Sequence, residues 1–156
     1  MAPITIGLFE AHLIVANLDA SIAFYRDRLG IELAHVVPAR KAAFFWIGPR
    51  GRTMLGLWAG GFGPQKTTSH IAFTAALDDV VAAPRTLRGA GITPLDFDGQ
   101  PTDEPVVLAW MPAASIYFLD PDGHLLEYIA MLTDEPRPDA GVVRWSEWKE
   151  LWFKAR

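Results

Sequence analysis

One order of predicted secondary structure occurs twice along this chain of 156 residues, and that repetition limits the possible folds more than any other feature. A strand, a helix and three further strands are predicted between about residues 10 and 59, and again between about residues 69 and 131. Residues 60–68 are predicted to form a linker, and residues 132–156 a tail that ends in a helix. The sequence therefore predicts one α+β domain, 1–156, built of tandem βαβββ modules.

Strands are predicted from runs of β-forming residues, and helices from apolar residues at helical spacing. The first helix begins at Ala20 and ends at Gly30, a residue type suited to helix C-termini. The second opens at Leu77, and Pro84 inside it predicts a kink or a late start, because proline removes a helical hydrogen bond. Residues 96–113 predict one long loop. The strands with predicted bounds are 12–16, 32–37, 42–47, 53–58, 70–74, 115–119 and 125–131, and one strand of the second module has no predicted bounds.

The last two strands are predicted to form a β-hairpin around the turn Asp120-Pro121-Asp122-Gly123. Glu127 interrupts the apolar pattern of the second strand. A carboxylate in a half-buried strand is costly unless it is paired, hydrogen-bonded or bound to a metal. If the turn is centred on Asp122, Tyr117 lies directly across from Glu127, so we expect the carboxylate and the phenol side by side.

Two histidines head the first strands of the two modules. His12 and His70 each precede the Asp that starts the following helix, and strand parity places apolar neighbours such as Leu13 and Phe73 on the opposite face. A lone strand histidine is usually a packed or surface group, but two in matching places with Glu127 form a 2-His-1-carboxylate set. Such sets bind divalent metals and leave coordination positions open. His35 and His124 have no matching partner, and we interpret them as a strand surface residue and a turn residue.

From about residue 10 to residue 131, the sequence resembles the vicinal oxygen chelate superfamily. The resemblance rests on the tandem βαβββ plan and on the run Y-F-L-D-P-D-G-H-L-L-E at 117–127. The superfamily includes glyoxalase I, extradiol dioxygenases, fosfomycin-resistance enzymes and bleomycin-resistance proteins. The resemblance implies a half-open barrel around a metal and substrate cleft. It also implies that His12, His70 and Glu127 are the metal ligands.

The resemblance implies a metal-dependent enzyme that acts on a small molecule through two adjacent oxygens chelated to Fe²⁺, Mn²⁺, Zn²⁺ or Ni²⁺. Glu127 and Tyr117 are the expected catalytic residues, with Tyr117 as hydrogen-bond donor or proton relay, although simple sheet packing would also explain the tyrosine. Glyoxalase I enzymes bring a further acid from the last strand of the first module, where this chain has Leu55 and Gly56. Weak or absent glyoxalase I activity is therefore expected. A fosfomycin-type thiol transferase and a non-catalytic drug or metabolite binder stay open as alternatives.

Composition excludes several classes of function. Without cysteine, the chain has no disulfide, thiolate metal site or cysteine nucleophile. The net charge is −4 and the sequence has no basic stripe, so nucleic acid is not an expected partner. No apolar run approaches the roughly 20 residues that a membrane span needs. Residues 1–9 lack the basic start and cleavage site of a signal peptide, so the cytoplasm is the expected compartment.

Six tryptophans are many for this length. Trp46, Trp58 and Trp110 are expected to line the substrate pocket. Trp145, Trp148 and Trp152 recur at helical spacing near the C-terminus and predict an apolar helix face. An apolar face of this kind predicts a homodimer, because a single small domain would not cover it fully.

Overall fold

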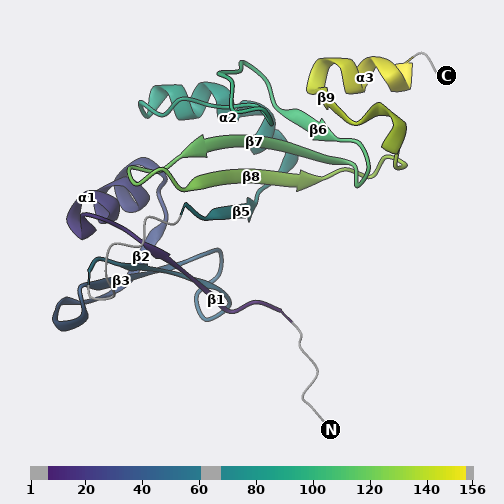
Figure 1. Cartoon of the computed structure of the whole chain (residues 1–156). Helices are drawn as coiled ribbons and strands as arrows, with labels where there is room; N and C mark the ends of the chain where they lie inside the picture. The colour runs from purple at the N-terminus through teal and green to yellow at the C-terminus, as the bar shows by residue number, and fades with distance from the viewer. Residues whose placement is uncertain (1–6, 61–67, 154–156) are drawn as a thin grey trace, which may run out of the picture. The chain divides into compact units, whose positions relative to one another are not determined.

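The structure, a computed structural model, describes residues 7–60 and 68–153. The chain divides into two compact units, Met1–Ser69 and His70–Arg156. Each holds one βαβββ module with one open sheet (Figure 1), which confirms the predicted α+β class and the tandem modules. Most of the predicted linker, residues 61–67, lies outside the described residues. The half-open barrel stays a prediction.

The first unit contains a four-stranded sheet in the order β1-β4-β3-β2, with β1 parallel to β4 and the other pairs antiparallel. The Asn17 side chain accepts a hydrogen bond from the Ala20 backbone N–H at 3.0 Å and so caps the first helix. After the π-helical turn, Gly30 adopts φ +68°, as a helix end requires. The elements are β1 (Glu10–Ile14), α1 (Leu18–Ala23), a π-helical turn (Phe24–Arg28), β2 (Glu32–Val37), a 3-10 turn (Pro38–Arg40), β3 (Ala42–Trp46) and β4 (Met54–Trp58).

One face of the first sheet forms the core of its unit. Leu13, Phe45 and Leu57 are fully buried there with Tyr25, and α1 packs on β3 and β4. Because side chains alternate along a strand, His12 lies on the opposite face. The predicted parity of the first strand is therefore confirmed.

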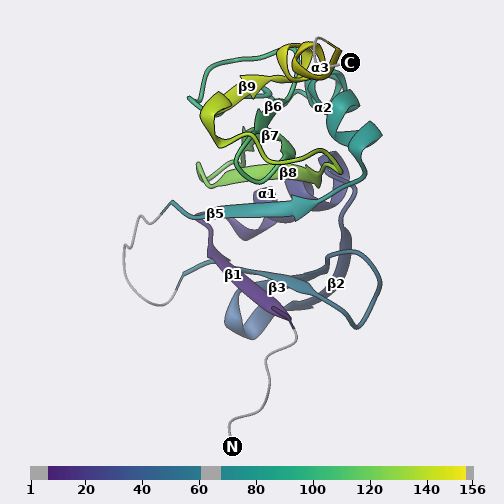
Figure 2. The same cartoon turned by 90° about the vertical axis from the view of Figure 1, so that its right-hand side faces the viewer.

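The second unit repeats this order as β5-β8-β7-β6 and adds β9 beside β6 (Figure 2). Its helix α2 packs on β7 and β8 (Figure 1), where Val80, Leu87 and Phe118 are buried. Phe73 is also buried, so His70, three residues before it, lies on the other face of its strand. The elements are β5 (His70–Thr74), α2 (Leu77–Gly89), β6 (Val106–Leu108), β7 (Ala113–Leu119), β8 (Leu125–Met131), a 3-10 turn (Pro138–Ala140), β9 (Val142–Arg144) and α3 (Trp145–Phe153).

The β7–β8 hairpin has the predicted register, with Tyr117 opposite Glu127. Its turn is held by the Asp120 carboxylate, which accepts hydrogen bonds from the backbone N–H groups of Asp122 and His124, each at 2.9 Å. Gly123 adopts φ +85°, which the turn requires.

Two predictions about the second module are wrong. The helix α2 begins at Leu77 and runs through Pro84, so it has no late start; the kink stays a prediction. Residues 96–113 are not one loop, because β6 lies within them and is paired on both sides. The three residues Val106–Leu108 are all buried, and this burial stabilises a strand too short to show an alternating pattern.

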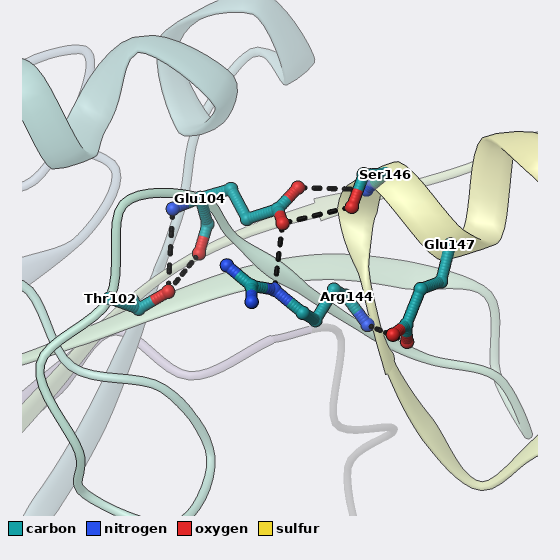
Figure 3. Close-up of polar contacts among 5 residues, drawn as sticks. All are labelled: Thr102, Glu104, Arg144, Ser146 and Glu147. Atoms are coloured by element: carbon teal, nitrogen blue, oxygen red, sulfur yellow. Dashed lines mark hydrogen bonds and ion pairs between the residues drawn. The ribbon is translucent and has the colours of Figure 1, made fainter.

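The C-terminal strand and helix are fixed to the sheet by Glu104, as Figure 3 shows. The Glu104 carboxylate accepts hydrogen bonds from the Ser146 backbone N–H at 2.8 Å and the Ser146 hydroxyl at 2.9 Å, and pairs with the Arg144 guanidinium at 2.7 Å. Glu147 accepts from the Arg144 backbone N–H at 3.1 Å, which satisfies another donor at the start of α3. The strand β9 was not predicted.

Trp148 on α3 is only 1% exposed, and its indole Nε1–H donates to Asp134 Oδ2 at 2.8 Å. The chain itself therefore buries this residue of the predicted apolar face, so Trp148 gives no support to the predicted homodimer. The homodimer stays a prediction that needs another interface. No helix in the described part of the chain has the length and apolar character needed to cross a membrane.

Candidate functional site

The second unit pairs two of the predicted metal ligands. His70 at the start of β5 and Glu127 on the adjacent strand β8 bring Nε2 and Oε2 to 3.0 Å. Glu127 is 4% exposed, whereas the His70 side chain is about half exposed. The pair thus joins the buried carboxylate of Glu127 to the imidazole of His70, which solvent can reach.

Tyr117 stands directly across from Glu127, and its ring centroid lies 6.1 Å from that of His70. Burial raises the pKa of the Tyr117 hydroxyl well above its ordinary value, and the negative charge of Glu127 raises it further. The hydroxyl is therefore protonated at neutral pH and can donate a hydrogen bond beside the carboxylate.

Three buried side-chain atoms in the described part of the chain have no hydrogen-bond partner: Glu127 Oε1, Ser115 Oγ and Trp58 Nε1. Ser115 lies two residues before Tyr117 on β7, so these two residues and Glu127 share one face of the second sheet. A buried polar atom without a partner is costly and calls for an explanation such as an ion or a ligand.

The first unit presents a second histidine–carboxylate pair. His12 Nε2 lies 3.0 Å from Glu10 Oε1, and both residues are on β1. The imidazole covers Gly56 on the adjacent strand and stands beside Phe44 and Trp58, with ring centroids 6.1 Å and 5.6 Å away. A side chain at position 56 would occupy the same space as this imidazole.

The two histidines do not occupy equivalent rows of their sheets, which corrects the predicted match. His12 is the third residue of β1 and pairs with Gly56 on β4. His70 is the first residue of β5, whereas the third residue of β5, Ala72, pairs with Glu127 on β8. Gly56 on β4 therefore occupies the position equivalent to that of Glu127 on β8, and it is one of the two residues, Leu55 and Gly56, that were predicted there. The offset of two residues arises from how the strands pair. Because two is an even number, each histidine still lies on the face of its strand opposite the buried core residues.

The tryptophans expected in the pocket come from both units, Trp46 and Trp58 from the first and Trp110 from the second. Trp58 stands beside His12, and Trp46 lies on the same face of the first sheet, opposite Met54. Trp110 is 60% exposed in the turn between β6 and β7. This turn is at the start of β7, whereas the 120–123 turn that leads to Glu127 is at its end. Their role as a pocket lining stays a prediction.

Sequence reasoning missed two residues near Tyr117. Ser115 was detectable, because hairpin register and strand parity place it on the same face. Phe97 carried no such signal: its loop folds back through a bridge between Leu95 and Tyr117, which brings the rings of Phe97 and Tyr117 to 6.3 Å.

The other two histidines belong to neither pair. His35 is exposed beside a bulge in β2. His124 directly follows the 120–123 turn and is buried, with its backbone N–H bonded to Asp120.

Within residues 7–60 and 68–153, no three histidine, aspartate or glutamate side chains gather closely enough to hold a metal ion. Each pair nevertheless fits a divalent metal. The nitrogen and oxygen atoms of both pairs are 3.0 Å apart, which is an ordinary hydrogen-bond distance and also the separation of two adjacent ligands of an octahedral ion with bonds of about 2.1 Å. The free, buried Oε1 of Glu127 supplies a further acceptor.

Comparison with known proteins identifies the family. The sequence model of the Glyoxalase/Bleomycin resistance protein/Dioxygenase superfamily matches residues 6–128, which leaves β9 and α3 outside the match. An integron cassette protein from the mobile metagenome of the Halifax Harbour sewage outfall is 31% identical, with a TM-score of 0.69 over 81% of this chain and 100% of its own.

Two further structures share the fold. A glyoxalase/bleomycin resistance protein/dioxygenase from Nocardioides is 26% identical, with a TM-score of 0.62 over 86% of this chain and 89% of its own. The fosfomycin resistance protein FosX from Listeria monocytogenes, solved with Mn(II) and sulfate, is 25% identical, with a TM-score of 0.59 over 83% of this chain and 94% of its own. The chain therefore belongs to the Glyoxalase/Bleomycin resistance protein/Dioxygenase superfamily.

Proposed function

We propose that this protein is a metal-dependent enzyme that acts on a small molecule with two adjacent oxygen atoms. His12, His70 and Glu127 are the proposed ligands of one divalent cation, and Tyr117 is the proposed catalytic hydrogen-bond donor. The carrying observation is Glu127: a carboxylate that is 4% exposed, with one oxygen beside His70 and the other without a partner. A bound cation would offset the cost of burying that charge.

The side chains around Glu127 support binding of a polar substrate. The Tyr117 hydroxyl, held neutral by burial, can donate to an oxygen that gains negative charge during the reaction. The unpartnered Ser115 hydroxyl on the same face offers a second donor or acceptor. The metal, when bound, would supply Lewis-acid polarisation of the chelated oxygens.

The metal is one of Fe²⁺, Mn²⁺, Zn²⁺ or Ni²⁺ in this proposal. The Mn(II) in the structure of FosX, a protein 25% identical to this chain, favours testing Mn²⁺ first. Substrates to test are catechols, a methylglyoxal–glutathione adduct and fosfomycin with water or thiols. A protein that only sequesters a drug or metabolite is the competing function, and it needs neither turnover nor a metal.

The test compares the protein treated with EDTA and then loaded with each metal in turn, using all three substrate classes. We expect turnover with at least one metal, none in EDTA, and a loss of at least about 100-fold in kcat in Glu127→Gln. Asp27→Asn serves as the control, because Asp27 pairs with its neighbour Arg26 on the exposed side of the π-helical turn. Turnover that persists in EDTA, or that Glu127→Gln retains, would contradict the proposal.

The predicted homodimer and cytoplasmic location are part of this proposal. Exposed apolar side chains at one end of the second sheet support a dimer interface. Met131 on β8 is 65% exposed, Val142 on β9 is exposed in the same row with β7 and β6 between them, and Trp110 is exposed in the turn that joins β6 to β7. Sedimentation at micromolar concentration should give twice the chain mass, and Met131→Glu should reduce it to a monomer. A monomeric wild-type protein would argue against the dimer.

A further inference from the structure

In the second unit, the segment 94–102 folds back beside β7 and holds Phe97 in a fixed place. Leu95 exchanges two backbone hydrogen bonds with Tyr117, at 2.7 Å and 3.0 Å. The Asp96 carboxylate accepts hydrogen bonds from the backbone N–H groups two and four residues later, at 3.0 Å and 2.8 Å. The backbone on both sides of Phe97 is therefore bonded, and the position of its ring follows from the fold of this segment.

Phe97 shares a face of the second sheet with Tyr117 and Glu127. Tyr117 lies directly opposite Glu127 on one side and directly opposite Leu95 on the other, and directly opposed residues point to the same face. Phe97 comes two residues after Leu95, and its ring centroid lies 6.3 Å from that of Tyr117 with an angle of 73° between the rings. The two rings therefore meet edge to face and form an apolar corner beside the carboxylate.

The corner joins exposed apolar surface to buried polar groups. Phe97 is 55% exposed, and Leu119, two residues after Tyr117 on the same face, is 48% exposed. Tyr117 and Glu127 are almost fully buried, and Glu127 Oε1 has no hydrogen-bond partner. A phenylalanine that served only the core would be buried, because apolar surface left in water contributes no stability. The Phe97 ring is instead available to the apolar part of a ligand whose polar part reaches Tyr117.

We infer that Phe97 is a specificity-determining residue and that the favoured substrate carries a planar aromatic ring next to an oxygen atom. The ring of the substrate lies against Phe97, and its oxygen accepts a hydrogen bond from the Tyr117 hydroxyl. Flat rings gain from stacked and edge-to-face contacts with such a corner, whereas a puckered saturated ring does not. This inference rests on the proposed function, in which Tyr117 is the donor, but the preference for a flat ring needs no bound metal.

The experiment titrates the isotope-labelled protein in EDTA with 2-naphthol and with its saturated analogue decahydro-2-naphthol, and follows the backbone amide shifts by NMR. It compares wild type, Phe97→Leu, Phe97→Ala and the control Val81→Ala. Val81 is also an exposed apolar residue, at 38%, but it lies on α2, which packs on the other face of the sheet. The loss of an apolar side chain is thus matched on a surface that the inference does not involve.

We expect 2-naphthol to shift the amides around Phe97 and Tyr117 and to bind wild type about 2–10-fold more tightly than the saturated analogue, the advantage typical of an aromatic contact. Phe97→Leu should lose this preference, and Phe97→Ala should bind both probes more weakly. Val81→Ala should bind both as wild type does. All three variants should keep the wild-type melting temperature, because the replaced side chains are exposed.

Three results would overturn the inference: equal binding of the two probes by wild type, a preference that Phe97→Leu retains, or amide shifts confined to other parts of the chain. The titrations contain EDTA and need no turnover, so they are independent of the assay of the proposed function. Absence of the ring preference together with metal-dependent turnover refutes the role of Phe97 alone. Absence of turnover in a protein that shows the preference refutes the proposed function alone.

Discussion

Gly56→Ala adds one methyl group at the point on β4 where the imidazole of His12, on the adjacent strand β1, lies over the sheet. The new carbon would lie 2.6 Å from Cδ2 of His12, far inside normal contact, and 3.2 Å from a ring carbon of Phe44, which is tighter than normal by a few tenths of an ångström. The glycine has no positive φ, so the whole effect comes from this contact. The imidazole and the methyl group cannot both occupy these positions.

The expected magnitude follows from overpacking, which costs about 1–3 kcal/mol per inserted group. At about 2–4 °C per kcal/mol for a chain of this size, the melting temperature should fall by about 2–12 °C. Displacement of the His12 ring should also weaken Mn²⁺ binding at least about tenfold, since the ring is a proposed ligand.

Thermal melts in EDTA and Mn²⁺ titrations measure the two effects. Gly89→Ala is the matched control: Gly89 ends α2 and has nothing within 4 Å of an added Cβ, so the change in stability should stay within about 1 kcal/mol. A Gly56→Ala protein with wild-type melting temperature and wild-type Mn²⁺ affinity would refute the placement of His12 over Gly56.

Three further outcomes are expected. Because burial raises the Tyr117 pKa above its ordinary value of about 10, the contribution of Tyr117 to stability in EDTA should be constant up to about pH 10 and be lost at higher pH. Urea melts of Tyr117→Phe should show a smaller fall, and an identical slope would contradict this. Glu104→Ala should cost about 1–3 kcal/mol, because it removes the acceptor for Ser146, and should speed amide exchange in α3; unchanged exchange would show that Glu104 does not hold the helix. Trp148→Phe leaves Asp134 without its indole donor and should destabilise by about 1–3 kcal/mol in urea, so a neutral result would show that this bond contributes nothing.

Sequence patterns predicted the features that depend on local alternation and turn chemistry. The hairpin register followed from the Asp120–Gly123 turn and from side chains that alternate between faces, and Tyr117 is opposite Glu127 as expected. The faces of His12 and His70 followed from the same alternation. Each of these features depends on residues within one strand or one tight turn.

Features set by long-range pairing were not predictable. The strands β6 and β9 have three residues each, too few to show a period of two. They form because β6 pairs with β7 on one side and with β9 on the other. The two-residue offset between His12 and His70 depends on how β1 and β5 align with β4 and β8. The burial of Trp148 depends on packing within the chain, which helical spacing alone does not reveal.

Anomalous diffraction from Mn²⁺-loaded crystals tests the central claim most directly, because it locates the metal without reference to any substrate. We predict one strong peak per chain, within about 2.0–2.3 Å of His12 Nε2, His70 Nε2 and a carboxylate oxygen of Glu127. The peak should be absent from crystals of Glu127→Gln. No peak in the wild type, or a peak that does not touch Glu127, would contradict the proposed metal site.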